Sequence, residues 1–255
     1  MRKYWGLNRR SPLEPTMKVI ITCGPSFEPI DDVRRITNFS TGELGIQLSN
    51  ALASAGFEVF CFKGTGATHG GPRETCHLRL FNTNEDLLAL LRQASTSHEI
   101  ETVFHVAALC DYRVAHVEDD HGRGCHSAKI ASRSGSLTIN LEPAVKVIGK
   151  LRNLFPRSIL VGWKYELVGA RNDALARATR QIEQNRTEAC VLNGRAFGPG
   201  FAFCQNGEPH REFSDKRRLV QFLSAWLEER LCGWTRSPGL GHGPHRGKRR
   251  PIYQI

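Results

Sequence analysis

Short apolar runs rich in β-branched and aromatic residues recur along the chain, and segments with helical spacing of apolar residues separate them. Short runs that are apolar throughout are typical of strands buried on both faces of a sheet. Strands that alternate with helices form a parallel sheet, because each helix carries the chain back across it. The sequence therefore predicts an α/β fold: a Rossmann-like, doubly wound, mostly parallel sheet with helices on both faces. The predicted strands are residues 18–24, 57–62, 78–81, 102–108, 136–142, 158–164 and 188–193, and the predicted helices are 40–55, 84–94, 144–155, 171–185 and 215–231.

The net charge of +10 belongs mainly to the two ends of the chain. Residues 1–16 carry four Lys/Arg and one Glu, and residues 232–255 carry five Lys/Arg and no acidic residue. Only +2 is left for residues 17–231, so the basic charge is not expected to line a groove in the fold. We predict one domain over 17–231, a basic N-terminal extension over 1–16 and a basic Gly/Pro-rich tail over 232–255. For the tail, a solvated segment is favoured over a nucleic-acid contact.

Several classes of protein are disfavoured by what the sequence lacks. No apolar run approaches the roughly 20 residues that span a bilayer, and the first 16 residues lack an apolar signal core. The eight cysteines are scattered and include no Cys-x-x-Cys pair. Neither a disulfide framework nor a protein metal site is therefore predicted. These features favour a cytoplasmic protein with reduced cysteines and no membrane partner.

The stretch RITNFSTGELG, residues 35–45, places small polar residues and glycines before a predicted helix. Ser40 and Glu43 fit a capping box. A helix N-terminus also presents free backbone N–H groups and partial positive charge, which suit a phosphate. Ser40 would add a hydroxyl donor, and Gly42 and Gly45 would let a ligand approach the backbone. These residues alone leave a phosphate site and a simple helix cap equally open.

The common dinucleotide signatures are absent. The first strand leads into Gly-Pro-Ser rather than the G-x-G-x-x-G pattern, and the second strand ends at Lys63 without an acidic ribose partner. The Tyr-x-x-x-Lys pair of many reductases also fails at Tyr4, Tyr112 and Tyr165. A hydride-transfer enzyme is therefore disfavoured.

Four motifs lie after predicted strands or in the loop between two of them: ITCGPSFEPIDDVRRITNFSTGELG, AALCDYR, KIAS and GWKYE. Their order and spacing resemble the phosphopantothenate–cysteine ligase (phosphopantothenoylcysteine synthetase) family. The first motif is long and specific, the second supports it, and the last two are weak alone. The resemblance covers essentially residues 17–231. Since no flavin-dependent decarboxylase domain precedes these residues, the chain resembles the stand-alone ligase type.

The resemblance implies a two-step reaction in coenzyme A biosynthesis. A nucleoside triphosphate, CTP or ATP with Mg²⁺ on its phosphates, activates the carboxylate of 4′-phosphopantothenate as an acyl nucleotide and releases pyrophosphate. The amine of cysteine then attacks and forms an amide. The resemblance also implies a homodimer and a separate phosphopantothenoylcysteine decarboxylase as a partner enzyme.

The resemblance assigns site residues by position. Asn38 would bind the acyl-nucleotide intermediate, and Lys129, in the KIAS loop, would neutralise phosphate charge in the transition state. Ala131 and Ser132 stand where bacterial members have further lysines, and Trp163 stands where the family has Phe. A purely structural role stays open for each residue. The nucleotide-binding residues would be Gly24, Ser40, Gly42, Gly45, Trp163 and Asn193, and the substrate-binding residues Asn38, Ala107, Ala108 and Asp111.

Two other functions stay open: a non-catalytic nucleotide-binding paralogue of the ligase and, with less support, an NAD(P)-binding reductase. Pyrophosphate release that depends on both 4′-phosphopantothenate and cysteine would separate the ligase from both. The sequence does not choose between CTP and ATP.

Overall fold

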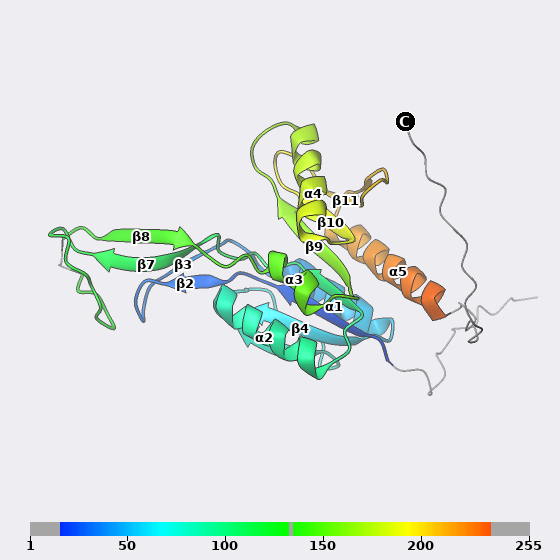
Figure 1. Ribbon diagram of the computed structural model, residues 1–255, viewed down its shortest axis with the longest axis horizontal. Coiled ribbons are helices and arrows are strands. Elements are labelled where there is room, and N and C mark those ends of the chain that lie inside the picture. Colours follow the sequence, from blue (N-terminus) through cyan, green and yellow to red (C-terminus); the bar gives the residue numbers. More distant parts are fainter. Residues whose placement is uncertain (1–15, 133–134, 236–255) are drawn as a thin grey trace, which may run out of the picture.

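The computed structural model describes residues 16–132 and 135–235 (Figure 1). Its strands are β1 (Lys18–Cys23), β2 (Phe27–Pro29), β3 (Arg35–Thr37), β4 (Glu58–Gly64), β5 (His77–Phe81), β6 (Thr102–His105), β7 (Tyr112–Glu118), β8 (Thr138–Pro143), β9 (Ile159–Tyr165), β10 (Ala189–Asn193), β11 (Phe201–Cys204) and β12 (Arg211–Phe213). Its helices are α1 (Glu43–Ser54), α2 (Asn84–Ser97), α3 (Ile148–Leu154), α4 (Arg171–Asn185) and α5 (Lys216–Thr235).

Within the described residues, one eight-stranded sheet has the order β12-β11-β10-β9-β6-β1-β4-β5. The strands from β10 to β5 in this order are parallel to their neighbours, and β11 and β12 complete the sheet as antiparallel strands. The predicted Rossmann-like, mostly parallel sheet is confirmed.

The order of strand addition reverses at β1. From β1 the chain adds β4 and β5 on one side, and it then returns to add β6, β9 and β10 on the other. The carboxyl ends of β1 and β6 are therefore neighbours, although the chain leaves them toward helices on opposite faces. Open parallel sheets bind ligands at such a switch point.

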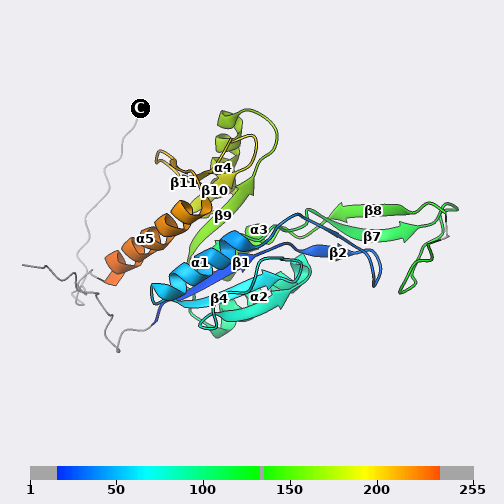
Figure 2. The same cartoon turned by 180° about the vertical axis from the view of Figure 1, so that it is seen from behind.

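Helices cover both faces of the sheet, as predicted (Figures 1 and 2). On one face, Val19 and Ile21 of β1 pack with Leu48 of α1 and with α5. On the other face, Ile20 packs with Leu151 of α3 and with α2, and α4 packs on β10 and β11. Consecutive residues of β1 thus enter two different cores, which explains why the strand is apolar throughout.

Two small antiparallel sheets extend beyond the main sheet: the β2–β3 hairpin and the β7–β8 arm (Figure 1). The sequence analysis predicted β8 but not β2, β3, β7, β11 or β12. In β7, Val117 is the one buried side chain, and the pairing register shifts between Val114 and His116. An exposed strand with an interrupted register lacks the run of apolar residues from which strands are predicted.

The observed helix boundaries match the predicted boundaries to different degrees. The structure places α4 at the predicted residues, 171–185, whereas α3 begins at Ile148 instead of 144 and α5 continues to Thr235 instead of 231. Residues 1–15 and 236–255 of the predicted basic segments lie outside the described residues. Across the described ranges, no helix is both long and apolar enough to cross a membrane.

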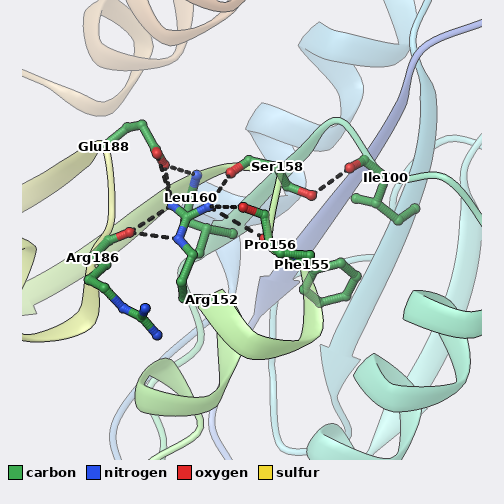
Figure 3. Close-up of polar contacts among 8 residues, drawn as sticks. All are labelled: Ile100, Arg152, Phe155, Pro156, Ser158, Leu160, Arg186 and Glu188. Carbon is green, nitrogen blue, oxygen red and sulfur yellow. Dashed lines mark hydrogen bonds and ion pairs between the residues drawn. The ribbon is translucent and has the colours of Figure 1, made fainter.

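Arg152 of α3 joins several segments at the amino edge of the sheet (Figure 3). Its guanidinium donates to both carboxylate oxygens of Glu188, each at 2.8 Å, and to the carbonyl of Arg186 at 2.7 and 2.9 Å. It also donates to the carbonyl of Ser158 at 2.9 Å. Glu188 in turn accepts from the amide of Leu160 at 2.6 Å. One side chain therefore connects α3, the end of α4 and the starts of β9 and β10.

Candidate functional site

The loops that follow β1 and β6 are bonded to each other at the switch point. Pro25 and Ala108 form a parallel bridge, and the amide of Ala108 donates to the carbonyl of Gly24 at 2.9 Å. The amide of Ala107 donates to the hydroxyl of Thr22 at 3.3 Å. The structure therefore brings Gly24, Ala107 and Ala108 together, as the sequence-based assignment requires.

Gly24 and Gly42 lie where three segments meet. Both have positive φ, 78° and 76°, so each adopts a conformation that side chains disfavour. A Cβ added to Gly24 would lie 2.7 Å from the Cβ of Ala67, and one added to Gly42 would lie 3.0 Å from the same atom. The loop after β1, the loop after β4 and the start of α1 are thus in direct contact.

The predicted capping box at Ser40 and Glu43 is wrong. Gly42 is the N-cap of α1, and no side chain caps the helix there. Because Gly42 is left-handed and lies directly before the helix, Ser40 is too far upstream to reach the first turn. The hydroxyl of Thr41 accepts from the amide of Glu43 at 3.3 Å. The first turn of α1 therefore keeps backbone N–H groups available for a ligand.

Gly45 is explained by packing. A Cβ at this position would overlap with the Cβ of Cys23 in β1, and both residues are buried. The missing side chain lets α1 lie directly on β1 beneath the loop that starts at Gly24. The sequence alone left open whether Gly45 serves packing or ligand approach, and the structure gives it the packing role.

Asn38 links the segment before α1 to the loop after β6. Its side-chain amide donates to the carbonyls of Leu109 at 2.8 Å and Ala108 at 3.3 Å. Asn38 is itself exposed. Its amide nitrogen is thus held against the predicted substrate-binding segment, and its side-chain oxygen accepts no hydrogen bond from the described residues. Ser40 follows on the same exposed segment.

Asp111 lies farther along the loop after β6 and is exposed. Its carboxylate is paired with the ammonium of Lys146, and its backbone carbonyl accepts from the amide of Ala144 at 3.0 Å. The side chain is therefore accessible to a ligand but already neutralised by a neighbouring cation.

Trp163 and Asn193 lie on the neighbouring strands β9 and β10. Trp163 is opposite Val191, and Asn193 is opposite Tyr165. The carbonyl of Asn193 accepts from the amide of Glu166 at 2.9 Å. Trp163 packs against the core under α1 and α5, and its buried indole nitrogen has no hydrogen-bond partner among residues 16–132 and 135–235. Strand β6 separates this pair from the loop after β1.

The structure does not bring Lys129 to Asn38. The backbone next to Lys129 is bonded to the turn between β2 and β3. The amide of Ile130 donates to Asp31 at 3.2 Å, and the guanidinium of Arg34 donates twice to the carbonyl of Ile130, each at 3.2 Å. That turn is at the end of the hairpin opposite to Asn38, and Lys129 is exposed there.

A buried polar network that is not predicted from the sequence lies beneath the loop after β6. Asn84, the first residue of α2, accepts from the hydroxyl of Ser26 at 2.7 Å and donates to the carbonyls of Cys110 at 2.8 Å and Val145 at 3.2 Å. The amide of Cys110 donates to Ser26 at 2.8 Å. Three loops are fixed by one side chain. Nothing in the local pattern distinguishes this asparagine from an ordinary first-turn residue.

His105, the last residue of β6, is a core residue. It is buried, and its Nδ1 is 2.9 Å from the hydroxyl of Thr22. Burial lowers the pKa of His105 to about 4, so the ring is neutral at physiological pH. Since the Thr22 hydroxyl accepts from Ala107, its own hydrogen is free to donate to His105, and the pair supports the loop after β6.

Glu28 of β2 is a buried carboxyl group, and one of its oxygens has no hydrogen-bond partner in the part of the chain that the structure describes. Burial raises the pKa of Glu28, nearby Glu85 adds to the rise, and Arg113 opposes it. The pKa of Glu28 is therefore higher in the folded state than in the unfolded state. The stability that protonated Glu28 contributes is fully present at pH values below its unfolded-state pKa. It is lost as the pH rises through the folded pKa.

We therefore expect Glu28→Gln to unfold at a higher temperature than the unmodified chain at pH 7.5. The difference should shrink as the pH falls toward 4, where Glu28 is protonated. Thermal unfolding at a series of pH values measures this, with the exposed Glu99→Gln as a control that should change little. A constant difference across the series would rule out the charge of Glu28 as its cause.

A hollow in the described part of the chain lies next to the candidate site, and another lies on the far side of the sheet. One hollow of about 620 Å³ lies beside the first turns of α1 and α5 and is lined by Glu43, Gln47 and Lys216 among others. The other, of about 450 Å³, lies between α2 and the edge of the sheet. The first adjoins the candidate site. No group of three or more His, Cys, Asp or Glu residues suited to a metal ion occurs in the described part.

Comparison with known proteins places this arrangement in a family. Residues 15–208 match the family described as the DNA/pantothenate metabolism flavoprotein C-terminal domain. The chain is 27% identical over 183 residues to the coenzyme A biosynthesis bifunctional protein CoaBC of Thermococcus kodakarensis, which covers 71% of this chain and 42% of that protein. It therefore spans less than half the length of this relative.

Two solved structures share the fold. The DNA/pantothenate metabolism flavoprotein of Streptococcus pneumoniae superposes with a TM-score of 0.75 at 22% identity, over 84% of this chain and all of that one. A Cab2 variant in complex with phosphopantothenate-cysteine gives a TM-score of 0.66 at 15% identity, over 87% and 89% of the two chains. Since the family match covers most of its length, the chain belongs to the family of the DNA/pantothenate metabolism flavoprotein C-terminal domain.

Proposed function

We propose that the chain is a ligase of coenzyme A biosynthesis, which joins 4′-phosphopantothenate to cysteine with a nucleoside triphosphate as co-substrate. The observation that carries the proposal is the contact of Asn38 with Ala108 and Leu109. This contact joins the long motif that contains Asn38 to the AALCDYR motif at the switch point, beside the uncapped first turn of α1. The family match, the coenzyme A biosynthesis relative and the Cab2 complex with phosphopantothenate-cysteine support the same reaction.

The proposed reaction proceeds in two chemical steps. A carboxylate oxygen of 4′-phosphopantothenate attacks the α-phosphorus of the nucleotide, and pyrophosphate leaves. The amine of cysteine then attacks the acyl carbon, the bond from that carbon to the phosphate oxygen breaks, and the nucleoside monophosphate leaves. Negative charge develops on phosphate in the first step and on the acyl oxygen in the second, so fixed donors accelerate both.

Most of the predicted residues have a place in this scheme. The loop at Gly24 and the first turn of α1 would hold the phosphates, together with Mg²⁺ that arrives on the nucleotide. Asn38, Ala107 and Ala108 would hold the acyl end of the substrate, and Asp111 its more distant part. Trp163 and Asn193, one strand beyond, would contact the nucleotide base and ribose. Lys129 would act only from a position other than the one described.

We also propose that the protein works as a homodimer and that a separate decarboxylase uses its product. Val33, Phe39, Tyr112 and Leu141 are exposed apolar side chains of the hairpin, the segment after it and the β7–β8 arm. A second copy would remove them from water. Sedimentation equilibrium should give twice the mass of the chain, and a monomer at micromolar concentration would contradict the dimer.

The ligase proposal is tested by pyrophosphate release with CTP and with ATP. Multiple-turnover release should require 4′-phosphopantothenate and cysteine together, and at least one nucleotide should support it. A non-catalytic paralogue would bind nucleotide without release, and a reductase would instead oxidise a reduced nicotinamide. Either result would overturn the proposal.

A further inference from the structure

A bound triphosphate needs positive charge that no carboxylate already neutralises. Three lysines at the carboxyl edge are paired with acidic side chains of the described chain: Lys146 with Asp111, Lys164 with Glu166 and Lys216 with Glu43. Lys63, which ends β4 with Gly64, has no carboxylate within 4 Å in the described ranges. Its charge is therefore available to a ligand.

The position of Lys63 is set by the loop that follows β4. Its ammonium donates to the carbonyl of His69 at 2.8 Å, and the amide of His69 donates to the carbonyl of Thr41 at 2.9 Å. Thr41 precedes the N-cap Gly42 of α1. Two hydrogen bonds thus connect the ammonium to the segment that opens the helix.

Packing holds the same loop against the candidate site. Ala67, between Lys63 and His69, contacts the positions of Gly24 and Gly42. Lys63 is opposite Cys23 in the register of β4 and β1, so it lies next to the residue from which the loop at Gly24 starts. Because the side chain is half-buried, its ammonium is partly shielded from water and from screening by salt.

The ammonium group of Lys63 is suited to binding an anion. In dinucleotide-binding sheets an acidic residue at the end of the second strand accepts hydrogen bonds from ribose hydroxyls. An ammonium group has three donors and no acceptor, so Lys63 cannot replace such an acid in that role. One donor is used by His69, which leaves the others for phosphate oxygens.

We propose that Lys63 binds the phosphates of the nucleoside triphosphate at the first turn of α1. The proposal rests on the proposed function, since it assigns a residue to the same site. The family resemblance assigns no role to Lys63. The absence of an acidic ribose partner at the end of the second strand does not assign it this role either. The loop after β4 becomes the third wall of the phosphate site, beside the loop after β1 and the helix N-terminus.

Titration calorimetry with Mg²⁺–CTP and Mg²⁺–ATP tests the assignment. For the nucleotide that the unmodified chain binds, Lys63→Met should weaken binding by about tenfold to a hundredfold, the loss expected for one charge-assisted contact. Lys63→Arg should recover most of this loss. The matched control is Lys18→Met, which removes the same charge from the first residue of the neighbouring strand, at the opposite edge of the sheet. It should bind as the unmodified chain does.

Two negative results of this binding experiment have different meanings. If the unmodified chain binds neither nucleotide, the proposed function is wrong and the role of Lys63 falls with it. If the unmodified chain binds and Lys63→Met binds equally tightly, only the role of Lys63 is wrong. Thermal unfolding checks each variant, and Lys63→Gln provides the same test with a second neutral side chain should Lys63→Met fail to fold.

Discussion

Asn38→Asp is expected to lower the rate of amide formation by at least about a hundredfold, because it breaks a fixed contact between the two motifs and places a negative charge beside the acyl centre. The amide of Asn38 donates to the carbonyls of Ala108 and Leu109. A carboxylate cannot donate to them and would repel both. It would also repel the phosphate of an acyl nucleotide. The substitution therefore disturbs the contact between the two motifs and the charge balance at the acyl centre together.

Rapid-quench measurements in a single turnover separate the two chemical steps. Pyrophosphate should still appear with Asn38→Asp, whereas the amide should form slowly after cysteine is added. Asn50→Asp in α1 is the control, because Asn50 accepts a hydrogen bond from the amide of Arg73 at 2.9 Å and aspartate can still accept it. Amide formation at the unmodified rate in Asn38→Asp would remove Asn38 from the site.

Arg152→Ala should destabilise the fold by about 3 kcal/mol, the loss expected when one partner of a largely buried ion pair is removed. The Arg152 side chain is 14% exposed, and its loss removes the charged partner of Glu188 and the donor of several carbonyls (Figure 3). For a domain of this size, the unfolding temperature should fall by roughly 6–12 °C.

Arg157→Ala is the matched control for Arg152→Ala. Arg157 pairs with Glu99 at 3.3 Å, but its side chain is 85% exposed. Exposed pairs contribute about 0–1 kcal/mol, so its unfolding temperature should change little. Equal shifts in the two variants, measured by calorimetry, would show that the amino-edge network does not stabilise the sheet.

The parallel sheet could be predicted because its strands are buried on both faces. In β1, consecutive residues Val19, Ile20 and Ile21 enter different cores, so the apolar run is continuous and easy to find. Strand β7 gave no such signal, since most of its side chains face water. The boundary of α3 was misjudged for a related reason. Ala144 and Val147 are buried and apolar before the helix begins, and burial alone does not reveal backbone conformation.

The site could be predicted in part, because sequence motifs mark residues but not contacts. Gly24, Ala107 and Ala108 do meet, and the side chain of Asn38 donates to the carbonyls of Ala108 and Leu109. The capping box failed because the left-handed Gly42 displaces Ser40 from the first turn. The role of Asn84 depends on three loops that are distant in sequence, and no local pattern encodes it. The placement of Lys129 depends in the same way on the turn at Asp31 and Arg34.

In the proposed reaction, this site activates a carboxylate as an acyl nucleotide and transfers the acyl group to an amine. This reaction is tested most directly with 4′-phosphopantothenate labelled with ¹⁸O in its carboxylate, together with cysteine and the nucleotide that supports turnover. We predict an amide product and a nucleoside monophosphate that carries one ¹⁸O, because the oxygen that attacks phosphorus stays on phosphate when the acyl carbon is released. Label in inorganic phosphate, or no amide at all, would contradict the account.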